Sequence, residues 1–117
     1  MNIDVLAEFV PYCAIGRLAE EVVLALAEAG HNVVASGQIV EGQWDSHVSK
    51  ILQQLAGETR PKATKVWVGP LTKVSGAPED SVIITGWEST RVPQEYAKHL
   101  RKARAVLTWG KWTADNM

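Results

Sequence analysis

Residues 16–36, GRLAEEVVLALAEAGHNVVAS, decide the fold, because their apolar pattern changes from helical spacing to a short continuous run. Gly30 follows the last helical turn, where a left-handed helix C-cap is expected. We therefore predict a helix from Gly16 to the residues before Gly30 and a strand over residues 32–36. The apolar stripe of the predicted helix consists of Leu18, Ala19, Val22, Val23, Leu26 and Ala27.

The residues before this stretch predict a first strand. Residues 11–15 then interrupt the strand pattern and provide the turn into the helix. Residues 1–36 thus form a strand-helix-strand unit, whose crossover is right-handed and leaves the two strands parallel. The strand-type side chains of residues 2–10 are Ile3, Val5, Leu6, Phe9 and Val10.

The middle of the chain continues the alternation of helix and strand. Asp45 or Ser46 can cap a second helix, for which Gly57 is the expected stop. Residues 65–69 predict a third strand, and residues 70–80 read as a long loop of the kind that often binds ligands. The core face of the second helix has the spacing i, i+3, i+4, i+7 and consists of Val48, Ile51, Leu52 and Leu55.

A strand-turn-helix unit then occurs twice, over residues 81–103 and 104–117. In each copy a short β-branched run ends in a Trp beside a Gly, and polar residues open the following helix. The whole order predicts a single Rossmann-like α/β domain over residues 1–117, with three layers. Its mainly parallel sheet has about five strands and is flanked by helices.

Composition excludes several classes of protein. Of the 117 residues, 46% are hydrophobic and 21% are charged, as in an ordinary globular domain. The formal net charge of −1 provides no basic field for nucleic acid. No apolar run reaches the roughly 20 residues of a membrane span, and the N-terminus lacks the basic region of a signal peptide. We expect a cytoplasmic protein.

No metal and no cofactor are expected. Cys13 is the single cysteine, so no thiolate zinc cluster can form, and no two histidines have the spacing of metal ligands. The turn after the first strand contains one glycine and lacks both a dinucleotide fingerprint and a P-loop lysine.

The turn after the first strand is nevertheless the first candidate binding element. In open α/β sheets ligands bind at the carboxyl ends of the strands, where backbone N–H groups at a helix start attract anions. Gly16 would allow close approach of a ligand, and Arg17 would add a charge-assisted hydrogen bond. The alternative is that Gly16 only permits the turn from strand to helix.

The second candidate element is the segment ESTRVP at residues 88–93. Glu88 would lie at the carboxyl end of the fourth strand, where a carboxylate can bind sugar hydroxyls or act as a base. Ser89 or Thr90 can cap the next helix, and Pro93 suits its first turn. The alternative is that Glu88 satisfies nearby backbone donors or pairs with Arg91.

Trp67, Trp87 and Trp109 fall at the ends of three successive predicted strands. Their aromatic faces could form a rim that stacks a sugar or a base. Each of them could equally fill the core, since a buried Trp needs only one partner for its N–H group.

Basic residues gather at the end of the helix that begins near Pro93. Cations late in a helix interact favourably with its dipole, which is the default explanation. The alternative is a patch for anionic membrane lipid. The basic residues are Lys98, His99, Arg101, Lys102 and Arg104.

These segments together resemble the N-terminal domain of GT-B-fold glycosyltransferases of the retaining, glycogen-synthase-like group. GRLAE at residues 16–20, AL at 25–26 and AGHNV at 29–33 match the family's G-R-x-A-E, A-L and G-H-x-V elements. ESTRVP at 88–93, followed by AV at 105–106 and WT at 112–113, is similar to a later family segment. Residues 37–80 match no segment of the family.

The resemblance implies the acceptor-side half of an enzyme that transfers a sugar from a nucleotide-sugar donor. In the family the donor and a pair of glutamates belong to a second Rossmann-like domain, which we expect to be absent from this chain. The chain is therefore expected to be inactive without a donor-binding domain. It also departs from the family in its bulkier first loop, residues 12–15, and in Gly110, which replaces the usual serine. The implied substrate-binding residues are Gly16, Arg17, Trp87, Glu88, Ser89, Thr90 and Trp109, and no catalytic residue is assigned.

Two alternatives stay open. The chain could be a non-catalytic module that binds a carbohydrate or a nucleotide. It could also be an interaction protein that self-associates, or binds a separate donor domain, through the face that the family turns toward its second domain.

Overall fold

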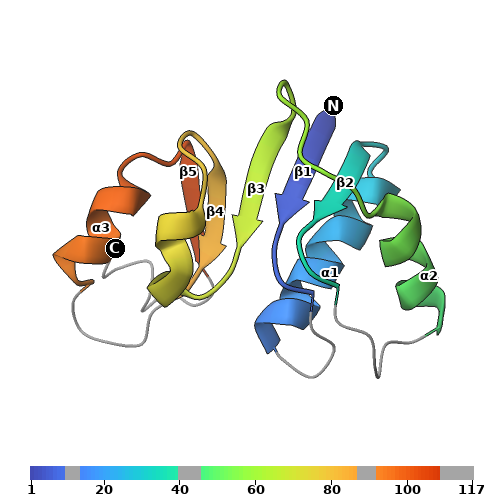
Figure 1. Cartoon of the computed structure of the whole chain (residues 1–117), viewed down its shortest axis with the longest axis horizontal. Helices are drawn as coiled ribbons and strands as arrows, with labels where there is room; N and C mark the ends of the chain where they lie inside the picture. The colour runs from blue at the N-terminus through green and yellow to red at the C-terminus, as the bar shows by residue number, and fades with distance from the viewer. Residues whose placement is uncertain (10–13, 40–45, 87–91, 109–117) are drawn as a thin grey trace.

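The computed structural model of the chain describes residues 1–9, 14–39, 46–86 and 92–108 (Figure 1). Within them, five strands form one sheet in the order β2-β1-β3-β4-β5, and every neighbouring pair is parallel. The predicted α/β class and the mainly parallel sheet of five strands are confirmed. The strands are β1 (Asn2–Leu6), β2 (Asn32–Ser36), β3 (Thr64–Val68), β4 (Val82–Thr85) and β5 (Ala105–Thr108).

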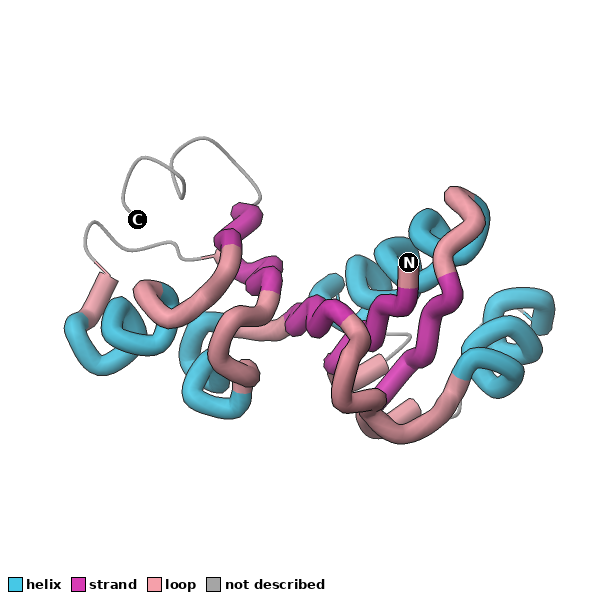
Figure 2. Tube along the Cα trace, turned by 90° about the horizontal axis from the view of Figure 1, so that it is seen from above, coloured by secondary structure: helices cyan, strands magenta, loops and turns pink. Residues whose placement is uncertain are grey.

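Helices lie on both sides of this sheet, as the view from above shows (Figure 2). Helix α1 packs Ala19 and Val23 against Ile3 and Val5 of β1. Successive residues of a strand point to opposite faces of the sheet. Trp67 of β3 pairs with Leu6 and therefore faces the side opposite to Val5, where it packs against the 3₁₀-helix η1. The helical elements are α1 (Ala14–Glu28), α2 (Ser46–Leu55), η1 (Leu71–Gly76) and α3 (Gln94–Leu100).

Most predicted elements occur, with shifted ends. The strand over residues 32–36 is confirmed as β2, whereas β1 ends at Leu6 and does not reach residue 10. Phe9 makes only an isolated bridge to Ile39. Helix α1 begins at Ala14, two residues before Gly16, and α3 ends at Leu100 rather than at residue 103. The helix predicted after residue 110 lies outside the described residues.

Residues 70–80, predicted as a long loop, contain the 3₁₀-helix η1 over Leu71–Gly76. The structure forms η1 there, because Leu71 and Val74 lie three positions apart and so face the same way in a 3₁₀-helix. Both are buried against Trp67 and Ile83. The packing of two apolar side chains on the sheet thus orders a segment that local sequence marks as a loop.

Two glycines take backbone conformations that side chains disfavour. Gly30 has φ +91°, and the N–H of His31 donates to the carbonyl of Leu26, which confirms the predicted left-handed C-cap of α1. Gly37 has φ +128° directly after β2. A Cβ atom at Gly37 would collide with the carbonyl oxygen of Ala7. The ends of β1 and β2 therefore approach each other closely because residue 37 has no side chain.

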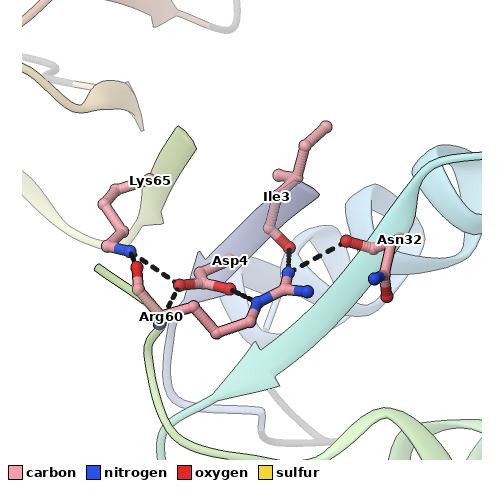
Figure 3. A network of polar contacts seen from close by, with 5 residues as sticks. All are labelled: Ile3, Asp4, Asn32, Arg60 and Lys65. Carbon is pink, nitrogen blue, oxygen red and sulfur yellow. Dashed lines mark hydrogen bonds and ion pairs between the residues drawn. The ribbon is translucent and has the colours of Figure 1, made fainter. Parts of the chain in front are cut away.

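A buried ion network fastens the segment between α2 and β3 to the sheet (Figure 3). Asp4 in β1 is fully buried and accepts hydrogen bonds from the backbone N–H of Arg60 (2.6 Å), the Arg60 Nε (2.8 Å) and the Lys65 Nζ (2.7 Å). The Nη2 of Arg60 also donates to the carbonyls of Ile3 (3.0 Å) and Asn32 (2.9 Å). Burial alone would raise the pKa of Asp4, but the hydrogen bonds from Lys65 and Arg60 outweigh it and lower that pKa.

Candidate functional site

The pocket of interest opens at the carboxyl ends of β1, β2 and β3. Strand β1 lies between β2 and β3 in the sheet. The connection after β1 leads to β2 on one side of it, and the connection after β2 leads to β3 on the other side, so the direction of the strand order reverses at β1. Such a switch point is where open α/β sheets bind ligands. The pocket has a volume of about 490 Å³, within the range of small-molecule sites.

Each wall of the pocket comes from a different segment. Leu6, Ala7 and Glu8 line it from the end of β1, and Ser36 and Gly37 from the end of β2. The opposite wall is formed by residues 67–70 with Lys73 and Gly76 of η1, and the first turn of α1 completes the lining. Three strand ends, the first turn of α1 and η1 therefore meet at one cavity.

Gly16 lines the pocket together with its neighbour Ile15, as the sequence predicted for the turn after the first strand. Both belong to the first turn of α1, where backbone N–H groups have no acceptor within the helix. Arg17 is exposed and is not part of the lining. The structure thus brings one of these two predicted residues to the site.

Trp67 is the one predicted rim tryptophan that falls within the described residues. Its side chain is 8% exposed and packs with Leu71, Val74 and Ile83, and it also borders the pocket. A Cβ atom at Gly69 would lie 2.8 Å from two carbons of the Trp67 ring. The backbone at residue 69 can therefore lie close to the Trp67 ring because that residue has no side chain.

The remaining predicted site residues stay predictions. Trp87, Glu88, Ser89, Thr90 and Trp109 lie outside the described residues.

Glu8 and Lys73 are pocket residues that the sequence reasoning missed. The Lys73 Nζ lies 3.3 Å from a Glu8 carboxylate oxygen, and the two side chains are 61% and 64% exposed. The ion pair thus joins the β1 side of the pocket to η1 where both meet solvent. Their sequence signals were weak: Glu8 follows the first strand, and Lys73 stands in the segment predicted as a binding loop.

The described lining carries few ionisable side chains. Glu8 is the one carboxylate among the described lining residues, and Lys73 accompanies it. In the described part of the chain, no group of three or more His, Cys, Asp or Glu side chains could hold a metal ion. The site therefore presents a concave, largely apolar surface with one ion pair.

Two of the basic residues near α3 have acidic partners. Arg104 Nη2 lies 2.8 Å from Asp80 Oδ2, and Lys102 Nζ lies 3.4 Å from a Glu79 oxygen. The hydrogen bond and charge of Arg104 lower the pKa of Asp80. These ion pairs account for two of the five cations that the sequence marked as a possible lipid patch. Over the described ranges, no helix is both long and apolar enough to cross a membrane.

No protein-family model matches this chain, and comparisons with curated proteins and with solved structures find no similar protein.

Proposed function

We propose that this chain is the acceptor-side domain of a cytoplasmic glycosyltransferase, and that the pocket at the switch point binds the sugar acceptor. One observation carries the proposal: Gly16 of the segment GRLAE lines the pocket at the first turn of α1. The same segment supports the resemblance to glycosyltransferases. Sequence motif and cavity thus point to the same place.

The proposal assigns binding to this chain and donor chemistry to another domain. The described pocket offers one carboxylate, which is paired with Lys73. Transfer needs both substrates in fixed relative positions, so the domain alone should bind an acceptor without turning over a nucleotide sugar.

Glycine amide signals provide a direct test. Among the glycines in the described residues, four line the pocket: Gly16, Gly37, Gly69 and Gly76. In NMR spectra of ¹⁵N-glycine-labelled protein, we expect a binding hexose or methyl hexoside to shift these four signals saturably. Gly30 and Gly57 do not line the pocket, so their signals should not move. UDP-glucose should leave the four pocket signals in place.

A pair of substitutions checks that the pocket is responsible. A Cβ atom at Gly76 meets no atom within 4 Å, so a phenylalanine there can narrow the pocket without a clash of its Cβ. Gly76→Phe should weaken acceptor binding at least about tenfold, whereas Ser75→Phe, at an exposed position outside the lining, should not. The opposite result would be that UDP-glucose shifts the NMR signals of the pocket glycines and the simple sugars do not. The acceptor-side assignment would then be wrong, and a nucleotide-binding module would be favoured.

A further inference from the structure

The inner lining of the pocket is mainly apolar. Leu6, Ile15, Trp67 and Val68 contribute hydrocarbon and ring surface, and carbon atoms make up most of the exposed lining. Among the described lining residues the side chains with polar atoms are those of Glu8, Ser36 and Lys73, and Trp67 through its indole N–H.

The polar side chains are not spread evenly over the pocket. Glu8 and Lys73 are each more than half exposed and lie 3.3 Å apart, so they stand at the solvent side. Val68 is buried and Trp67 nearly so. The pocket therefore changes from a charged mouth to an apolar interior.

An apolar interior disfavours the binding of a free sugar inside the pocket. A sugar bound inside would bury several hydroxyl groups, and each needs a hydrogen-bond partner to offset its loss of water. An alkyl chain or an aromatic ring gains free energy from the same surface, because it leaves water without losing hydrogen bonds.

We propose that the acceptor is amphipathic: its apolar chain or ring fills the interior of the pocket, and its hydroxylated head lies beside Glu8 and Lys73. This inference rests on the function proposed above and specifies the class of acceptor. The apolar part supplies most of the affinity, and the ion pair orients the head.

The test compares three probes on the ¹⁵N-glycine-labelled 117-residue chain: methyl β-D-glucoside, n-hexyl β-D-glucoside and 1-hexanol. Each buried methylene is worth about fourfold in affinity, and hexyl adds five methylenes to methyl. If about half of them enter the pocket, the hexyl glucoside should bind at least roughly tenfold more tightly than the methyl glucoside. Shifts at Gly16, Gly37, Gly69 and Gly76 report binding at this pocket.

Each outcome separates this inference from the proposed function. Equal affinity for the two glucosides overturns the amphipathic acceptor and leaves the acceptor site standing. Equal affinity for 1-hexanol and the hexyl glucoside overturns the proposed function, because the sugar head then contributes nothing. Absence of any saturable shift overturns both.

A matched pair of variants locates the apolar contact. Ile15 lines the pocket, whereas Leu24 is a half-buried residue of the same helix outside the lining. Ile15→Ser should weaken binding of the hexyl glucoside severalfold more than binding of the methyl glucoside. Leu24→Ser should retain the full preference, and an equal loss in both variants would contradict the proposed location.

Discussion

Replacement of Asp4 by alanine is expected to lower the free energy of unfolding by about 3 kcal/mol. Asp4 is fully buried and accepts three hydrogen bonds from Arg60 and Lys65, which would lose their anion in the variant. Removal of one member of a buried ion pair costs about 3–5 kcal/mol. The lower end applies because the side chains of Arg60 and Lys65 are 28% and 19% exposed and can regain some water.

Urea unfolding followed by circular dichroism measures this loss. The matched control is Glu79→Ala, which removes an ion pair with Lys102 whose side chains are both largely exposed. Such surface pairs contribute about 0–1 kcal/mol. Similar losses in the two variants would mean that the buried network does not stabilise the fold.

The same network predicts how stability changes with pH. The pKa of Asp4 is lower in the folded chain than its ordinary value of about 3.9. Its stabilising contribution is therefore complete above about pH 4 and declines as the pH falls toward the lowered folded pKa. In Asp4→Asn this part of the acid dependence should disappear, which unfolding curves at neutral and acidic pH would reveal.

Replacement of Gly37 by alanine is also expected to destabilise the chain strongly, by about 3 kcal/mol. Two costs add. The φ of +128° is strained for any residue with a side chain, and the new Cβ would collide with the carbonyl oxygen of Ala7. The end of β1 must then move away from β2, although the N–H of Ala7 bonds the carbonyl of Ser36 there (3.1 Å).

Gly30→Ala is the control that separates strain from collision. Gly30 also has a positive φ, +91°, but a Cβ atom there meets no other atom within 4 Å. We expect a loss of about 1 kcal/mol from the left-handed conformation alone. Equal losses in the two variants, measured by urea unfolding, would show that the close approach at Ala7 is not limiting.

An element of this structure can be predicted from the sequence when the interactions that form it are between residues close together in the chain. The apolar stripe of α1, its C-cap at Gly30 and the run that forms β2 all depend on neighbouring residues, and all were predicted. The 3₁₀-helix η1 was missed because its order depends on contacts with Trp67 and Ile83 in two strands.

In the candidate site, too, local features could be predicted and long-range contacts could not. Gly16 was predicted because the first turn of a strand-helix unit lies at the carboxyl edge of any parallel sheet. The pairing of Glu8 with Lys73 joins residues 65 positions apart, and that of Asp4 with Arg60 joins residues 56 apart. No local pattern signals such pairs. The one indication in the sequence is that Asp4 stands within the apolar run of the first strand, where a buried carboxylate needs a cationic partner.

The position of β3 has a consequence for how the chain assembles. Strands β1 and β2 come from residues 2–36 and strands β4 and β5 from residues 82–108, so each outer half of the sheet is built from a continuous stretch of chain. The pairing of β1 with β3 joins these halves, and its Asp4–Lys65 contact spans 61 positions. Closing so long a loop costs more chain entropy than forming either half. We therefore expect the meeting of β1 and β3, beside the candidate pocket, to be the late and rate-limiting event of folding.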